Sequence, residues 1–267
     1  MARSLFWLRA SNKLWFRLTL ALLAIVCLIP RTTAAEKAQP LRVFIRASAK
    51  THGPGAHDYP RFLEEWKKLL TERGAVVEGA TRSPTEAELA KTDVLLLYVS
   101  DGTNIGEEDR SRLEAFLKRG GGMVSLHDTI CGTNTAWFAG LAGGAKKHGE
   151  MNWRTGPLKL NFTDRSHPIV QGAADFDMDD EIFFKLTMTP DAHVLATATH
   201  KEGEAVPQLW VVERSLPGGR PYRAVVSLQG HWFACFDQPE YQRLLLRGIA
   251  WAGRRPVDLL MKDSSRR

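Results

Sequence analysis

The stretch Asp93-Val-Leu-Leu-Leu-Tyr-Val99 is a continuous apolar run behind a single charged residue. Such a run is typical of a strand that is buried on both faces of a parallel sheet. Residues 107–119 predict a helix with acidic residues at its start and basic residues at its end, and Gly120 follows as a cap, in agreement with the helix dipole. Gly122-Met-Val-Ser-Leu126 predicts the next strand.

The same alternation precedes this stretch. Residues 41–47 predict a first strand, the apolar periodicity from Tyr59 to Leu70 predicts a helix that ends near Gly74, residues 76–78 predict a second strand, and Ser83-Pro84 opens a short helix. Alternating strands and helices favour βαβ units and a parallel sheet that is covered on both faces.

The pattern changes after residue 155. Short apolar runs with few helices between them predict additional, partly antiparallel strands, and a last helix carries Tyr241, Leu244, Leu245 and Ile249 on one face. The predicted strands lie at residues 158–162, 180–186, 193–199, 208–213 and 222–228. The expected fold is therefore α/β, with a mostly parallel sheet and extra antiparallel strands in the C-terminal half.

Charge excludes one broad class of partner. The 267 residues include 36 Lys+Arg and 30 Asp+Glu, a formal net charge of +6. Five of the basic residues precede position 36, where no acidic residue occurs, so the rest of the chain is nearly neutral. A nucleic-acid-binding domain would need a basic surplus on one face, and we expect no nucleic-acid partner. With 44% hydrophobic and 25% charged residues, the composition is that of an ordinary globular protein.

The first 35 residues predict a secretory signal peptide. A basic segment ends at Arg17, the run from Leu18 to Ile29 is apolar apart from Thr19, and Thr33-Ala-Ala35 offers small residues for cleavage. The apolar run is short for a membrane span, although an uncleaved anchor stays an alternative. Either form places the working domain outside the cytoplasm, in the periplasm or secreted.

The remaining chain is expected to form one domain at residues 41–255, between a short linker at 36–40 and a tail at 256–267. An oxidising compartment permits a disulfide between Cys131 and Cys235, but two buried thiols are the simpler expectation.

Three predicted strands run into histidines. The first leads to the loop that holds His52, His57 and Asp58, the fourth to His127 and Asp128, and a late strand to Gly230-His231-Trp232. Ligands bind beyond the carboxyl ends of the strands in open parallel sheets, so we expect these segments to meet in one crevice.

Several of these motifs together resemble a known family. Gly120-Gly-Gly-Met-Val-Ser-Leu-His127, Ser166-His-Pro-Ile-Val170, Asp180-Glu-Ile-Phe183 and Leu228-Gln-Gly-His231 resemble the ThuA-like (trehalose utilisation) domain over about residues 41–253. The resemblance implies the class I glutamine amidotransferase-like superfamily with a flavodoxin-like core. It also implies a role in carbohydrate metabolism, often with sugars oxidised at C3, and it marks Glu181 as the matching carboxylate.

Two nucleophile mechanisms fit the residues poorly. A glutaminase needs a cysteine on the sharp turn after a strand, where this chain has His127, and Ser125 lies outside a G-x-S-x-G context. Cys131 is four residues beyond the turn. A hydrolase that uses Cys131 is kept as the third alternative.

The leading hypothesis is an exported enzyme that isomerises or cleaves a keto-sugar or its glycoside by acid/base chemistry. His127 or Glu181 would be the base and His231 the acid. His52, His57, Asp128 and Trp232 would contact the substrate. A non-catalytic carbohydrate-binding module of the same fold is the second hypothesis.

The sequence leaves the cofactor open. A divalent metal is possible, with ligands drawn from His52, His57, His127, His231 and Glu181, because imidazole and carboxylate suit zinc or a similar ion. We expect no dinucleotide cofactor, because the glycine cluster at 120–122 precedes a strand and does not open a helix. The sugar and the oligomeric state are not predicted.

Overall fold

The computed structural model describes residues 39–201 and 203–261. The chain divides into two units, Met1–Gln39 and Pro40–Arg267, and the second is the folded domain. The predicted signal peptide, most of the linker and the end of the tail lie outside the described residues. Among the residues that are described, no helix is both long and apolar enough to cross a membrane.

Five parallel strands form the first half of a nine-stranded sheet, in the order β2-β1-β3-β4-β12. They are β1 (Arg42–Ala47), β2 (Val76–Ala80), β3 (Val94–Tyr98), β4 (Gly122–Leu126) and β12 (Pro221–Ser227). All five residues of β3 and of β4 are buried, as the apolar runs predict. The expected fold class is confirmed.

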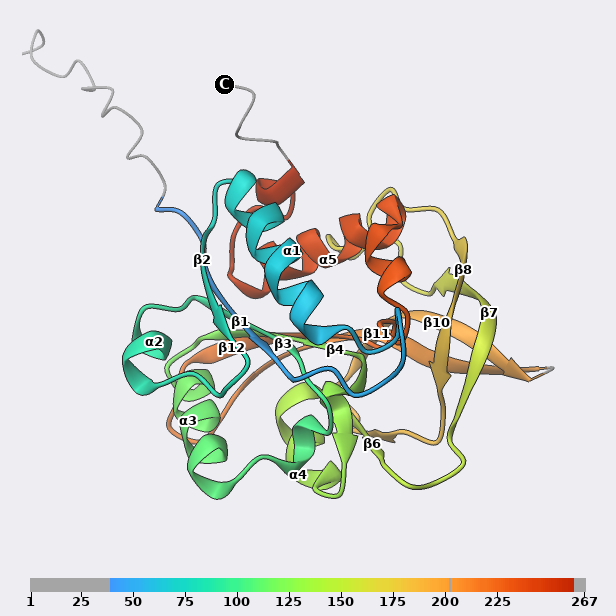
Figure 1. Ribbon diagram of the computed structural model, residues 1–267, viewed down its shortest axis with the longest axis horizontal. Coiled ribbons are helices and arrows are strands. Elements are labelled where there is room, and N and C mark those ends of the chain that lie inside the picture. Colours follow the sequence, from blue (N-terminus) through green and yellow to red (C-terminus); the bar gives the residue numbers. More distant parts are fainter. Residues whose placement is uncertain (1–38, 202, 262–267) are drawn as a thin grey trace, which may run out of the picture. The chain divides into compact units, whose positions relative to one another are not determined.

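The antiparallel half continues the sheet as β12-β11-β10-β7-β8. Its strands are β7 (Trp153–Phe162), β8 (Phe176–Phe183), β10 (His193–Lys201) and β11 (Glu204–Ser215). β7 pairs with β10 at only two positions, Ala196↔Phe162 and Thr197↔Asn161, but with β8 along most of its length. The β7–β8 hairpin therefore diverges from the sheet (Figure 1).

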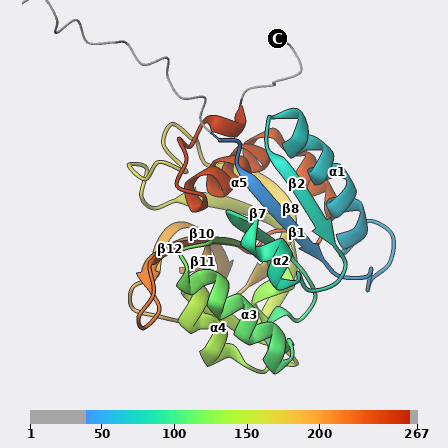
Figure 2. The same cartoon turned by 90° about the vertical axis from the view of Figure 1, so that its left-hand side faces the viewer.

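Helices cover both faces of the sheet (Figures 1 and 2). One face carries α1 (Tyr59–Glu72) and α5 (Pro239–Ala252), and the other carries α2 (Glu86–Ala90), α3 (Glu107–Lys118) and α4 (Thr135–Ala142). α2 begins later than Ser83-Pro84 predicts. Its N-cap is Thr85, and the reciprocal bonds between Thr85 and Glu88 form a capping box that fixes the start of the helix.

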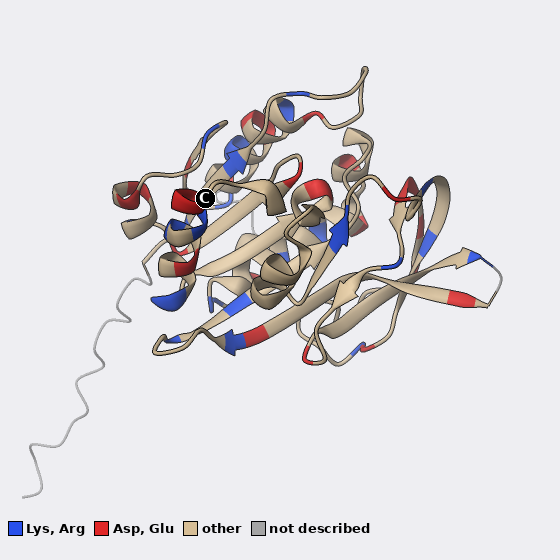
Figure 3. Ribbon diagram, turned by 90° about the horizontal axis from the view of Figure 1, so that it is seen from below, with Lys and Arg blue, Asp and Glu red and all other residues tan. Residues whose placement is uncertain are grey.

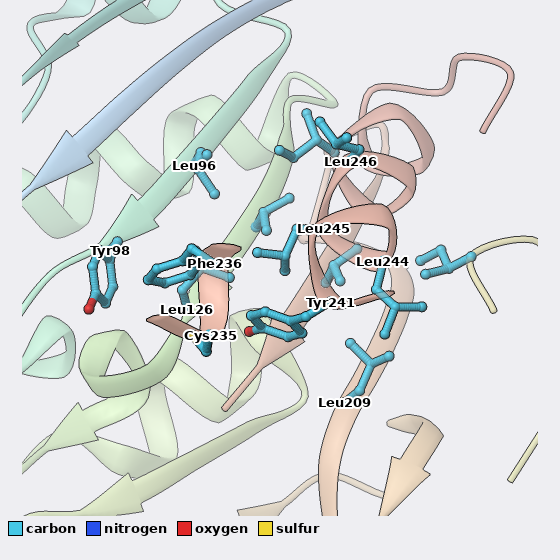
Figure 4. Packing of buried hydrophobic residues seen from close by; sticks show 14 of the residues in the cluster. Leu96, Tyr98, Leu126, Leu209, Cys235, Phe236, Tyr241, Leu244, Leu245 and Leu246 are labelled. Carbon is cyan, nitrogen blue, oxygen red and sulfur yellow. The ribbon is translucent and has the colours of Figure 1, made fainter. Parts of the chain in front are cut away.

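The core under α5 is continuous with the strands (Figure 4). Tyr241, Leu244 and Leu245 of α5 are buried together with Leu209 of β11 and with Phe236. Phe236 belongs to a 3₁₀ turn, η3 (Phe233–Asp237), whose burial supports the loop behind β12. Apolar burial of this kind is the main stabilising term of the fold.

A second, three-stranded sheet was not predicted. It consists of β5 (Cys131–Gly132), β6 (Gly144–Lys147) and β9 (Thr187–Met188), and α4 connects its first two strands. Three further 3₁₀ turns are η1 (Gly102–Asn104), η2 (His127–Ile130) and η4 (Leu259–Met261). The small sheet covers η2 and so encloses the turn that follows β4.

Charged residues of both signs are interspersed on the helices and hairpins (Figure 3). Many form ion pairs within one element or between neighbours, as Arg112 does with Glu108 and Asp109 of α3. Exposed pairs of this kind contribute little to stability.

Candidate functional site

Four ligand-type side chains meet at the carboxyl ends of the parallel strands. His127 follows β4 directly, His57 lies in the loop between β1 and α1, and His231 lies just beyond β12. Glu181 reaches the same point from β8. One side-chain nitrogen or oxygen from each residue lies within 4.8 Å of the others. We call these four residues the His₃Glu cluster.

The backbone is strained where two of the four residues are placed. His57 and His127 have φ angles of +43° and +48°, in the left-handed region that residues other than glycine rarely adopt. Strained residues of this kind persist only where surrounding structure holds them, and they concentrate at functional sites. Here a backbone hydrogen bond of 2.8 Å from the His57 N–H to the His231 carbonyl joins the two loops.

Four of the six distances between the ligand atoms of the cluster are close to the edge length of a tetrahedral metal site. His57 Nε2 lies 3.1 Å from His127 Nε2 and 3.0 Å from His231 Nδ1. Glu181 Oε2 lies 3.4 Å from His127 Nε2 and 3.6 Å from His231 Nδ1. Zinc bonds of about 2.0–2.1 Å in tetrahedral geometry separate neighbouring ligand atoms by about 3.4 Å. The four distances therefore suit one four-coordinate cation.

The proton positions also favour a cation. His127 Nδ1 lies 2.8 Å from the carbonyl oxygen of Leu228, which only accepts, so the proton sits on Nδ1 and the Nε2 lone pair faces the cluster. His57 Nδ1 lies 3.3 Å from Asp128 Oδ2, and a carboxylate favours the proton on this nitrogen, which would leave the Nε2 lone pair facing the cluster as well. Two imidazole lone pairs that face each other at 3.1 Å repel one another unless a proton or a metal ion lies between them.

Outer contacts of this type are what metal-ligating histidines use. A ligating imidazole almost always donates its other N–H to a carboxylate, a backbone carbonyl or water, which fixes its tautomer and its orientation. The Leu228 carbonyl serves His127 in this way, while His57 Nδ1 contacts the Tyr59 hydroxyl at 3.0 Å and lies 3.3 Å from the Asp128 carboxylate. The donor set of the His₃Glu cluster therefore fits a divalent ion of the zinc type.

The electrostatic environments of the cluster histidines differ. Burial, reinforced by the charges of neighbouring histidines, lowers the pKa of His57 to about 3, so this imidazole is neutral at physiological pH. Burial also disfavours the charged form of His231, but the hydrogen bond and negative charge of Glu181 outweigh it and raise the pKa of His231 above 6.5. The neutral form that binds a metal is therefore favoured at His57, whereas Glu181 favours the protonated form of His231.

Asp180 fixes the turn that carries His231. Its buried carboxylate accepts hydrogen bonds from the backbone N–H groups of Gly230, His231 and Glu181, at 2.6–3.3 Å. Burial raises its pKa, although these donors oppose the rise. The Tyr98 hydroxyl donates to the carbonyl of Gly230 and holds the same turn from below.

The structure brings the remaining predicted site residues to this region. The ring centres of His127 and His231 are 5.8 Å apart, so the expected convergence occurs. His52 is exposed, with its ring centre 3.9 Å from that of His57, and therefore lies at the rim. Asp128 is buried behind His57, and the Trp232 ring centre lies 4.6 Å from that of His231.

Sequence reasoning missed three contributors. Tyr59 fits the apolar periodicity of its helix, and only the packed structure shows its hydroxyl against His57 and Asp128. Asp180 belongs to the family-matching segment Asp180-Glu-Ile-Phe183, but nothing in that segment shows that its carboxylate binds the backbone of the His231 turn. Lys146 is 3% exposed, and its Nζ lies 4.3 Å from the centre of the Phe183 ring, which stacks on His127. In the sequence Gly144-Ala-Lys-Lys147 a lysine beside a second lysine gives no local signal of burial.

The environment of the cysteines argues against a thiolate nucleophile. Cys131 and Cys235 are both buried and free. Burial, together with the negative charge of Asp128, raises the pKa of the Cys131 thiol well above its usual value. A protonated thiol is a poor nucleophile, so the geometry disfavours the Cys131 hydrolase alternative.

Comparison with known proteins agrees with the fold and the motifs. The trehalose utilisation (ThuA) family model matches residues 46–252. A putative ThuA-like protein from Bacteroides uniformis has a TM-score of 0.62 and 20% identity, over 84% of this chain and 97% of that one. A second from Parabacteroides merdae has a TM-score of 0.61 and 18% identity, over 80% and 90%. A β-galactosidase from Rahnella sp. R3 has a TM-score of 0.53 and 13% identity, over 82% of this chain and 32% of that one. No curated protein matches.

Proposed function

Because the chain belongs to the ThuA-like trehalose utilisation family, we propose that it is a metal-assisted enzyme that acts on a keto-sugar or on a glycoside of one. The observation that carries the proposal is the His₃Glu cluster, whose ligand atoms lie at tetrahedral spacing beyond the carboxyl ends of β1, β4 and β12. A buried cluster of titratable groups at this end of an open α/β sheet is the usual place for a reaction.

In this proposal the three histidines hold the ion, and Glu181 moves the proton. Among the described residues, none outside the cluster forms a hydrogen bond with the Glu181 carboxylate, whereas His57 and His127 are each fixed by a second partner. The His231 ring is likewise held only by the cluster, and of these two side chains Glu181 is the carboxylate, so we assign it to leave the ion. A carboxylate within reach of the substrate can act as general base.

The substrate class follows from what such a base can do. A ketone acidifies the neighbouring C–H bond, so the Glu181 carboxylate can take that proton and leave an enolate. The bound metal would polarise the ketone oxygen and stabilise its negative charge. When the adjacent carbon carries a hydroxyl, transfer of its O–H proton to the enolate oxygen and return of the first proton to the former carbonyl carbon gives isomerisation. Expulsion of a substituent one carbon further on, with the proton passed to the departing oxygen, cleaves the glycosidic bond. Neither route needs an oxidant or a reductant.

Export is part of the same proposal. It is supported by the basic segment that ends at Arg17, the apolar run from Leu18 to Ile29 and the small residues up to Ala35. Cell fractionation and N-terminal sequencing test it. A mature N-terminus near Glu36 in the periplasm or the medium is expected, and a cytoplasmic chain that keeps Met1 contradicts it.

The activity is tested by an NMR time course on the protein from Glu36, loaded with zinc or treated with EDTA. The substrates are a 3-keto-disaccharide, the unoxidised disaccharide and glutamine. We expect turnover of the keto-sugar alone, lost with EDTA and in Glu181→Gln and His127→Ala. His193→Ala is the matched control, because His193 is a half-exposed histidine paired with Asp164 away from the cluster. Line broadening without product would favour the binding module, and turnover that resists EDTA would contradict the metal role.

A further inference from the structure

A groove of about 350 Å³ borders the loop that carries His231. Its lining includes Trp232, Phe233, Arg61, Asp179 and Asp237. The volume lies within the range of about 300–1,000 Å³ that small-molecule sites occupy. None of these residues belongs to the His₃Glu cluster, so the groove is a separate feature of the surface.

Trp232 is an exposed aromatic side chain on a fixed backbone. It is 37% exposed and is one of few large apolar residues on the described surface that are not mostly covered. Its backbone forms an antiparallel bridge with Ala56, and the Phe233 N–H donates to the Gly55 carbonyl at 2.7 Å. An indole held rigidly at the rim of a groove is available for contact at a low entropic cost.

Several polar groups that line the groove have no side-chain partner among the described residues. Arg61 bonds Glu65 through Nε at 2.7 Å, and its guanidinium lies over Phe233 at 3.7 Å. Within residues 39–201 and 203–261, no side-chain hydrogen bond uses the Arg61 Nη groups or the carboxylates of Asp179 and Asp237. The groove thus offers donors, acceptors and an aromatic face to a ligand.

This combination suits a sugar ring. The C–H face of a pyranose can pack against the indole of Trp232, its hydroxyls can donate to Asp179 and Asp237, and its oxygens can accept from Arg61. A nucleotide or another anion would meet two carboxylates against one guanidinium, and an apolar ligand would leave all three groups unpaired. Charge and shape therefore favour a neutral polyhydroxy compound.

We propose that this groove is a saccharide subsite, which binds the sugar unit attached to the reacting ring. The inference rests on the proposed function for the identity of the neighbouring ring. The ring centres of Trp232 and His231 are 4.6 Å apart, so a unit that stacks on Trp232 adjoins the cluster. The substrate class is accordingly a disaccharide or a longer glycoside rather than a free monosaccharide.

The test measures saccharide binding to the zinc-loaded wild type and variants by NMR titration. Trehalose, maltose and glucose are the probes. We expect saturation transfer from the protein to at least one disaccharide, with affinity roughly 10-fold weaker in Trp232→Ala and a smaller loss in Asp179→Asn, while glucose binding changes little. Trp137→Ala is the control, because Trp137 is a partly exposed tryptophan of α4 that bonds Glu114 outside the groove.

Three results would overturn the subsite: no disaccharide binds the wild type, Trp232→Ala binds as tightly as the wild type, or Trp137→Ala loses as much affinity. The melting temperature of each variant shows whether the fold is kept. Failure of the proposed function looks different, because disaccharides would then bind in a Trp232-dependent way while the keto-sugar is never turned over. If the keto-sugar is turned over but Trp232→Ala changes neither binding nor KM, the subsite is excluded and the proposed function is kept.

Discussion

Replacing Asp128 by asparagine should weaken metal binding without unfolding the protein. Asp128 is 6% exposed and its Oδ2 lies 3.3 Å from His57 Nδ1, and within the described part of the chain no other carboxylate pairs with that nitrogen. Asparagine keeps the shape and one acceptor oxygen but removes the charge that makes the imidazole a stronger ligand. His57 would still be present, with its orientation partly kept by the Tyr59 hydroxyl at 3.0 Å.

The size of the effect follows from the role of Asp128 as an outer partner. Loss of such a partner typically lowers metal affinity by about 10- to 100-fold, which corresponds to about 1.4–2.7 kcal/mol. Loss of a ligand itself should cost more, so His57→Ala should bind more weakly than Asp128→Asn. Tyr59→Phe, which keeps Asp128, should fall between the wild type and Asp128→Asn.

Zinc affinity is measured by competition with a chromophoric chelator at pH 7.5, with urea unfolding of the metal-free proteins alongside. Asp101→Asn is the matched control, because Asp101 pairs with His148 at an exposed site outside the cluster. An Asp128→Asn affinity within twofold of the wild type would show that Asp128 does not support His57 as a ligand. An equal loss in Asp101→Asn would do so as well, because the effect would then not depend on the contact with His57.

Three further predictions concern the same region. Gly230→Ala should cost about 1–3 kcal/mol of stability and weaken zinc binding, because a Cβ there, at φ +145°, meets three neighbours at 3.0–3.3 Å. Gly149→Ala, with positive φ and open space, should leave zinc binding unchanged in the same chelator assay. In EDTA, neutral His57 should make the wild type lose about 2 kcal/mol of unfolding free energy between pH 7 and pH 5, because the unfolded chain takes up a proton near pH 6.5 that the folded chain takes up only near pH 3. In urea unfolding, His57→Asn should lose about 2 kcal/mol less than the wild type between pH 7 and pH 5. If the unfolding free energies of both proteins fall equally with pH, the lowered pKa of His57 is contradicted. Lys146→Met should stabilise the fold, because the buried ammonium has no ion pair within the described ranges. The same change should reduce turnover about 100-fold, because it removes a hydrogen-bond donor near the site. An unchanged kcat would exclude a role of Lys146 in turnover.

The parallel half of the fold could be predicted because its signals are local. The apolar run at Val94–Tyr98 and the charge pattern of Glu107–Lys118 each specify one element without reference to the rest of the chain. Thr135–Ala142 gave no such signal. It is short and apolar on most sides, since it is packed between the main sheet and the small one. This helix can be identified only from the tertiary contacts that bury it.

The candidate site was predictable to the extent that it depends on parallel strands. His57, His127 and His231 follow β1, β4 and β12, whose carboxyl ends share one edge of the sheet. Glu181 lies on the antiparallel β8 at the far end of the strand order, so its approach depends on how the β7–β8 hairpin diverges. Only the family resemblance pointed to Glu181. The hydroxyl of Tyr59 could not be anticipated, because helical periodicity accounts for its burial without it.

The central claim about this protein is that the His₃Glu cluster holds one metal ion. X-ray absorption at the zinc edge, with elemental analysis of dialysed protein, measures this directly. We predict one zinc per chain with nitrogen and oxygen ligands at about 2.0–2.2 Å and scattering from three imidazoles, two of which remain in His231→Ala. Zinc that is lost on dialysis, or that is bound with the same imidazole count in the wild type and in His231→Ala, would contradict the account.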